Sequence, residues 1–216
     1  FSQDLKTQYE SAGKIDGGST AVNLNYGLPI GKKGGFINLT LDGLSSGKTF
    51  RQALDTSDYY NNEDAMYINI YRRGHGDASL DMIGTAMNME IPMKGKTSFY
   101  SFGTFNHKSS DAFAFTRNWS ARPDRFPTDG SGNLILVSSI MKTSRDGEIY
   151  YSPHIQTKIN DLSFAAGFKG NVKGWNWDLS NTLGRNNFHF YGDKTFNASK
   201  GANQTHFDDG GFNLLQ

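Results

Sequence analysis

The stretch Asp161–Arg185 decides the fold, and it reads DLSFAAGFKG, then NVKG, then WNWDLSNTLGR. In its first part, apolar side chains occupy every second position from Leu162 to Phe168. This is the period of a β-strand with two different faces. The last part alternates in the same way from Trp175 onward. Because the connector Asn171–Gly174 is short, the two parts are predicted to form an antiparallel hairpin.

The same alternation recurs in other parts of the chain. It predicts five further strands at residues 4–10, 22–28, 37–42, 83–91 and 97–106. The face assignment of the segment 97–106 stays open, because Phe99 and Phe105 lie out of phase with Tyr100 and Phe102. The stretch after Tyr191 shows no period that would predict a strand.

Composition narrows the class of protein. The chain has 216 residues, a net charge of +1 and a mean hydropathy of -0.58, and it contains no cysteine. A disulfide framework and a thiolate metal site are therefore excluded, and the scattered basic residues give no reason to expect nucleic acid. No apolar run is long enough for a transmembrane helix. A barrel strand crosses a membrane with only about ten residues, every second one apolar.

The connections between the predicted strands alternate between short and long. The short ones read GKKG, PMKGK and NVKG, and the long ones extend to about fifty residues, which is rare inside a compact soluble domain. Outer-membrane barrels have tight periplasmic turns and long extracellular loops. The predicted fold is therefore all-β: an antiparallel up-and-down transmembrane β-barrel segment of about seven strands, in contact with outer-membrane lipid.

Three runs resemble the early barrel of TonB-dependent outer-membrane receptors. They are GWNWDLSNTLGRNNFHFYGDKTFNAS at Gly174–Ser199, RRGHGDASLDMIGTAMNMEIPM at Arg72–Met93 and FYSFGTFNHKSSDAFAFTRN at Phe99–Asn118. The resemblance covers most of the chain after Ser19. It implies a barrel of 22 strands with a plugged lumen, of which residues 1–216 would form a part without the plug domain and the remaining strands. It also places Gln216 inside an extracellular loop.

The resemblance further implies a function and a location. The family sits in the cell outer membrane of Gram-negative bacteria and takes up scarce nutrients of the siderophore, cobalamin or glycan class. Energy arrives through the TonB complex, so the expected partners are the protein's own plug domain, TonB and the nutrient ligand. Neither catalysis nor a cofactor is implied. Polar residues expected to face the plug are Asn23, Asn25, Asn38, Asp42, Asn88, Glu90, Asp178 and Thr182.

The long loops carry aromatic rings and guanidinium groups, which grip polar ligands by stacking and by paired hydrogen bonds. The candidate ligand-binding residues are Tyr59, Tyr60, Arg117, Trp119, Arg122 and Arg125. The competing interpretation is that these side chains pack loop against loop. No metal site is expected, because the five histidines share no ligand spacing.

Two other functions remain open at this stage. A soluble β-sandwich that binds carbohydrate would explain the aromatic content, with Trp175 and Trp177 in its core rather than at a membrane interface. A barrel without transport activity, which acts as a component of a larger envelope assembly, is the second alternative. An enzyme is not expected, because the run Gly43–Thr49 fits neither motif that it resembles. It has one residue too few for a phosphate-binding loop, and its match to G-x-S-x-G at Ser45 follows an alternating strand rather than a buried strand of a doubly wound sheet.

Overall fold

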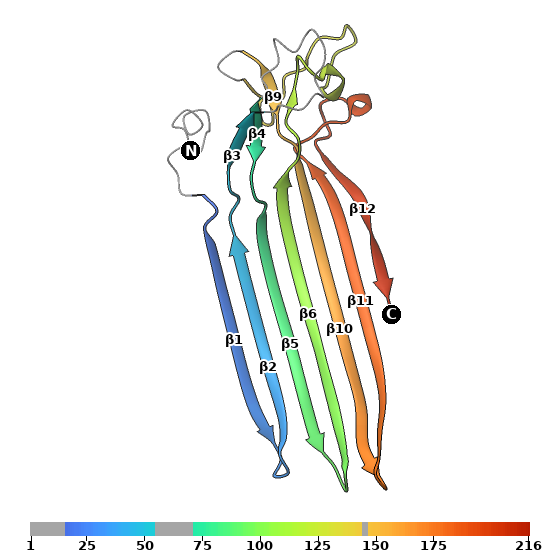
Figure 1. Cartoon of the computed structure of the whole chain (residues 1–216). Coiled ribbons are helices and arrows are strands. Elements are labelled where there is room, and N and C mark those ends of the chain that lie inside the picture. Colours follow the sequence, from blue (N-terminus) through green and yellow to red (C-terminus); the bar gives the residue numbers. More distant parts are fainter. Residues whose placement is uncertain (1–15, 55–70, 144–146) are drawn as a thin grey trace.

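The computed structural model describes residues 16–54, 71–143 and 147–216, and it is all-β. Seven strands form one antiparallel sheet in the order β1-β2-β5-β6-β10-β11-β12 (Figure 1). Their bounds are Ser19–Ile30, Gly35–Ser46, Ser79–Pro92, Thr97–Phe113, His154–Val172, Trp175–Asp193 and His206–Leu215. Each strand pairs with its neighbour in this order, which confirms the predicted all-β, antiparallel, up-and-down class.

The connections are short at one end of the sheet, called here the turn end, and long at the other, the loop end (Figure 1). Strands β10 and β11 extend further than predicted, so that only Lys173 and Gly174 connect them. Both residues have positive φ, 50° and 87°, as a two-residue type I′ hairpin requires. The predicted asymmetry of the connections is confirmed.

The seven strands are not the seven that the sequence predicts. The predicted strand 4–10 lies outside the described residues. The seventh strand is β12, which lies in the stretch where the sequence shows no period. At the end of β12, Gln216 exchanges backbone hydrogen bonds of 2.8 and 2.9 Å with Gly184. The expectation that Gln216 lies in a loop is therefore wrong, because the chain has already returned to the sheet.

The long connection between β6 and β10 folds into a small unit of its own at the loop end. Strands β7 (Arg117–Asn118), β8 (Lys142–Thr143) and β9 (Ile149–Tyr151) form a sheet in the order β7-β9-β8. Its core is Phe126, Met141 and Tyr151, all at most 5% exposed. In the main sheet, the only buried apolar side chain among the described residues is Ala165. The main sheet therefore has almost no core.

The remaining elements are short. Strands β3 (Arg51–Leu54) and β4 (Tyr71–His75) pair beside the loop end, and 3-10 helices span Pro123–Arg125 and Ala198–Lys200. In the described parts of the chain, no helix has the length and apolar character needed to cross a membrane.

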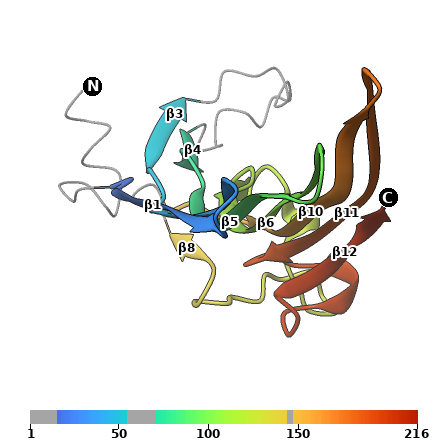
Figure 2. The ribbon, with the colours of Figure 1, turned by 90° about the horizontal axis from the view of Figure 1, so that it is seen from below.

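The main sheet is a single open layer. Strands β1 and β12 lie at its two edges and each pairs on one side only, as the view from below makes visible (Figure 2). Among the described residues, no second sheet of comparable size covers either face.

Candidate functional site

One face of the main sheet carries a continuous set of apolar side chains, called here the apolar band. Directly paired residues point to the same face, so the register identifies its members. They are Val22, Leu24, Tyr26, Leu28, Ile37, Leu39, Leu41, Ile83, Met87, Met89, Ile91, Phe99, Phe105, Leu162, Phe164, Ala166, Phe168, Val172, Trp175, Trp177, Leu179 and Leu183. Most of the large ones are exposed, up to 81% at Trp175. A patch of this size does not occur on ordinary soluble surfaces.

A row of polar side chains ends the apolar band on the loop side. His107 and Asn160 lie 2.7 Å apart through Nδ1 and Oδ1, and Asn187 Nδ2 donates to Asn213 Oδ1 over 2.6 Å. A longer contact of 3.5 Å from Asn160 Nδ2 to Asn187 Oδ1 joins the two pairs. The boundary between apolar and polar character is therefore sharp, within one row of the sheet.

The apolar band crosses the strands obliquely between β5 and β11. On the loop side it ends at Ile83 in β5 and at Leu183 in β11, although the register places Ile83 level with Asn187, four residues beyond Leu183. On the turn side, the band ends at Ile91 in β5, which is level with Leu179 in β11. On β11 the band continues four residues further, to Trp175. Four residues of about 3.3 Å across three strand spacings of about 4.8 Å correspond to an inclination of about 40°.

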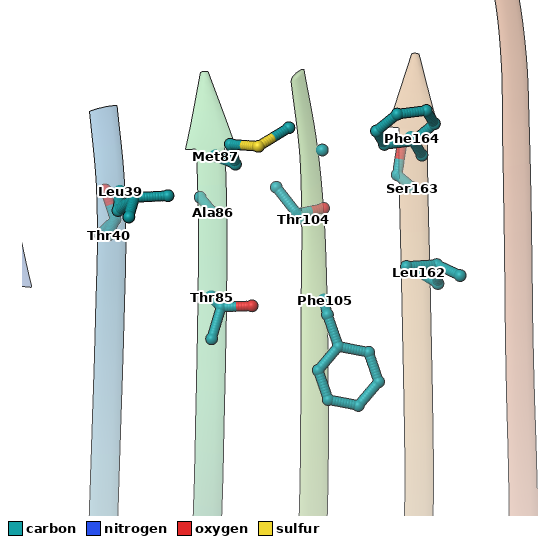
Figure 3. A pocket seen from close by; sticks show the side chains of 11 residues that line it. Leu39, Thr40, Thr85, Ala86, Met87, Thr104, Phe105, Leu162, Ser163 and Phe164 are labelled. Atoms are coloured by element: carbon teal, nitrogen blue, oxygen red, sulfur yellow. The ribbon is translucent and has the colours of Figure 1, made fainter. Parts of the chain in front are cut away.

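A shallow depression lies within the apolar band, around Gly103 (Figure 3). Its rim is formed by Leu39, Met87, Phe105 and Phe164 from four neighbouring strands. A Cβ atom at Gly103 would lie 3.0 Å from the Phe164 ring and 2.8 Å from a backbone oxygen, so the glycine makes room for the ring. A hollow with this lining fits hydrocarbon rather than a polar ligand.

The side chains predicted to face the plug share the opposite face of the sheet. Asn25 Nδ2 donates to Asn38 Oδ1 over 2.6 Å, and Lys169 Nζ donates to Glu90 over 2.8 Å. The Tyr100 hydroxyl donates to Asp178 over 2.8 Å, which also places Tyr100 and Phe102 on this face. Four of the eight have no side-chain partner among the described residues: Asn23, Asp42, Asn88 and Thr182.

The two faces exchange character beyond the polar row, toward the loop end. There the opposite face becomes apolar, with Leu44, Met82, Ile155, Ile159, Phe188, Phe190 and Phe212. Phe188 stacks on Phe212 with ring centroids 5.3 Å apart and planes 12° apart. Sequence analysis missed this aromatic cluster as a candidate site. The alternation of Phe188 and Phe190 was its only visible signal.

At the loop end, the face that carries the apolar band is covered by a polar network. The Lys48 ammonium bonds to Asp111, and His154 Nδ1 lies 2.8 Å from the same carboxylate. His206 and His189 likewise contact aspartates at 3.1 and 2.5 Å. No group of three or more metal-binding side chains occurs in the described part of the chain.

The predicted ligand-binding residues meet in the loop unit, apart from Tyr59 and Tyr60, which lie outside the described residues. Arg117 lies in β7, opposite Tyr151 of β9, and the Trp119 ring packs on Phe126 at 5.5 Å. Arg122 and Arg125 both pair with the Asp124 carboxylate, at 2.9 and 3.1 Å. The hydrogen bonds from Arg122 hold the pKa of Asp124 below its ordinary value. These contacts match the competing interpretation of loop-on-loop packing.

Tyr151 makes the loop unit sensitive to alkaline pH. Its side chain is 2% exposed, and its hydroxyl donates to the Arg125 carbonyl over 2.8 Å. Burial raises the pKa of the Tyr151 hydroxyl above its ordinary value. A raised pKa means that the stabilisation is complete below about pH 10 and is lost as the pH rises through the higher, folded-state pKa.

We therefore expect the loop unit to become more susceptible to proteolysis above about pH 10. Tyr151→Phe removes the hydroxyl and keeps the ring, so it should lose about 1 kcal/mol at neutral pH and show a weaker alkaline transition. Limited proteolysis across a pH series measures both effects. An alkaline transition of the same size in the variant would show that another group titrates.

Comparison with protein-family profiles, with curated proteins and with solved structures finds no match to this chain.

Proposed function

We propose that this chain forms part of the transmembrane β-barrel of a TonB-dependent receptor in the outer membrane of a Gram-negative bacterium. The observation that carries the proposal is the oblique, exposed apolar band. Strands of outer-membrane barrels are inclined by about 35–45° to the barrel axis, so the lipid layer crosses such strands at an angle. The inclination of about 40° derived from the register agrees with this range.

The height of the apolar band agrees with the same proposal. On β10 the band extends over ten residue steps, from Leu162 to Val172. At about 3.3 Å per residue and an inclination of about 40°, this corresponds to a height of about 25 Å. The apolar belt of outer-membrane barrels is also about 25 Å tall. Trp175 and Trp177 then lie at the turn-side limit, where tryptophan rings favour the membrane interface.

The opposite face supports a filled interior. Buried polar groups are nearly always hydrogen-bonded, and Asn23, Asp42, Asn88 and Thr182 have no side-chain partner in the described residues. A plug domain inside the barrel would supply such partners. In this mechanism the extracellular loops capture a nutrient of the siderophore, cobalamin or glycan class. The polar interior then holds the plug until TonB pulls on it.

The soluble β-sandwich is the less favoured alternative. A sandwich covers its apolar face with a second sheet, whereas Val22 and Leu39 are 54% and 44% exposed and no such sheet lies on them among the described residues. A barrel that serves an envelope assembly without transport shares all the features above, so it is separated from a transporter by experiment alone.

The position of the apolar band can be tested by cysteine labelling, because the chain contains no cysteine of its own. Phe164→Cys lies in the band, whereas Leu136→Cys lies in a loop at a position that is 65% exposed. In intact cells, a membrane-impermeant maleimide is expected to label Leu136→Cys rapidly and Phe164→Cys at least tenfold more slowly, because lipid excludes the reagent. Equal labelling rates would refute the lipid-facing band.

Transport is tested by growth of a deletion strain on ferric siderophores, cobalamin or glycans as the limiting nutrient. We expect a defect on one of these classes, and the same defect in cells that lack TonB. Normal growth on all of them would favour the envelope-assembly role.

A further inference from the structure

The turn end of the sheet gathers lysines that are far apart in the sequence. They come from all three tight turns and are Lys32, Lys33, Lys94, Lys96 and Lys173. All five side chains are exposed, and none has an ion-pair partner among the described residues. The three turns contain no acidic residue. The nearest lysine in a strand, Lys169, differs because Glu90 neutralises it.

The register brings two of these turns into direct contact. The amide of Asn171 donates to the carbonyl of Lys96 over 3.2 Å, which joins the β5–β6 turn to the β10–β11 hairpin. All three turns lie together at one end of the sheet (Figure 1). The fold therefore brings lysines that are distant in the sequence together at one positively charged edge, called here the lysine edge.

The lysine edge borders the apolar band. Trp175 is 81% exposed and stands two residues after Lys173. The Trp177 ring lies over Gly170, where a Cβ atom would be 2.9 Å from both the ring and the Lys96 carbonyl. Indole rings and lysines next to an apolar surface form the arrangement that holds a protein at a lipid headgroup layer, because the ring sits at headgroup level and the ammonium groups reach the phosphates.

We propose that the lysine edge binds anionic phospholipid headgroups, and that this makes the turn end selective for anionic over zwitterionic lipid. The inference rests on the proposed function, since it needs the apolar band to lie in lipid. An acidic segment of a soluble protein is a weaker candidate occupant. It would need the lysines but not the exposed tryptophans and Val172, which lipid covers together with the charge.

The tryptophans allow a direct test on the full chain in lipid vesicles. The chain has three tryptophans, so Trp119→Phe leaves Trp175 and Trp177 as the reporters. Their fluorescence is measured in vesicles that contain brominated phosphatidylglycerol or brominated phosphatidylcholine, which quench a ring only on contact. We expect phosphatidylglycerol to bind at these positions about fivefold more strongly at low salt, and the preference to fall as salt increases.

The decisive variant replaces the five lysines by Lys32→Gln, Lys33→Gln, Lys94→Gln, Lys96→Gln and Lys173→Asn. Asparagine tolerates the positive φ of 50° at position 173. The preference for phosphatidylglycerol should then fall to about one. A control variant at the loop end, Lys194→Asn with Lys200→Gln, should keep it, and Lys194 has the same φ of 50°.

The outcomes separate the two proposals. Equal quenching by both lipids in the protein with all five lysines would overturn this inference. A preference for phosphatidylglycerol that survives removal of the five lysines would overturn it as well. Both outcomes would leave the apolar band in lipid. If the lysine edge binds an acidic protein segment instead, both lipids should quench the tryptophans equally. An absence of quenching by either lipid would overturn the proposed function as well.

Discussion

Leu39→Arg is expected to cost about 2–4 kcal/mol of unfolding free energy in lipid vesicles, which is the penalty for an arginine at mid-bilayer on the lipid face of a barrel. Leu39 lies in the middle of the apolar band on β2, between Tyr26 and Met87, and it is 44% exposed. The guanidinium would enter hydrocarbon there, where no water can hydrogen-bond to it. Urea titration of the chain refolded into vesicles measures the cost.

Thr40→Arg is the matched control, one residue further along the same strand. Thr40 points to the opposite face, where its hydroxyl accepts a hydrogen bond of 2.8 Å from Asn25. The variant should lose about 1 kcal/mol for this bond and incur no lipid penalty. Equal costs for the two variants would contradict the assignment of the faces.

Phe126→Ala is expected to destabilise the loop unit by about 3–5 kcal/mol, as is usual when a buried phenylalanine is truncated. Phe126 is 1% exposed and lies edge-on to both Trp119 and Tyr151, with ring centroids 5.5 and 5.0 Å away. Because the described part of this unit has a small core around Phe126, Met141 and Tyr151, it has little capacity to close the cavity. Hydrogen exchange of the Trp119 amide, which donates to the Ile149 carbonyl, reports the local free energy of opening.

Two observations make the Phe126 result specific. Leu136→Ala, in the same loop at 65% exposure, should change the opening free energy by less than about 0.5 kcal/mol. Amides of the main sheet, such as that of Phe164, should exchange as before, since the loop unit has its own core. Faster exchange of the main sheet together with the loop would mean that the two form one cooperative unit.

The part of the fold that lies in the apolar band was predictable from the sequence. Between Leu162 and Leu183, for example, one face is apolar except at Gly170 and Asn181, so a period of two is visible. The tight turn between those strands was predictable as well. Strand ends were not, because both strands continue beyond the polar row: β6 is polar from Asn106 to Asp111, and the apolar side chains of β10 lie there on the other face. A segment such as 154–160 then looks like a polar loop, although it is paired along its whole length.

Strand β12 was missed for a local reason. A register shift at Phe190 and Tyr191 leaves one extra residue in β12, and Gly210 has φ of 86°. The apolar positions therefore change phase, with Phe207 before the bulge and Phe212 after it. An alternation that changes phase within ten residues does not stand out against an irregular loop.

The polar residues expected to face the plug were found to share one face, because they share the phase of the alternation. The loop residues were less predictable. Arginine and tryptophan serve ligand binding and loop packing equally well, and only the position of the Asp124 carboxylate between Arg122 and Arg125 indicates how these two side chains are used.

In the proposed membrane setting, the exchange of character at the row of His107, Asn160, Asn187 and Asn213 would fix how deeply the sheet is immersed. A downward displacement by one row would bring these hydrogen-bonded groups into hydrocarbon, and an upward displacement would pull Trp175 and Trp177 away from the interface. Both displacements would cost free energy, so the sheet would have one preferred depth in the membrane. A force applied to the plug domain from the turn end would then move the plug and leave the sheet in place.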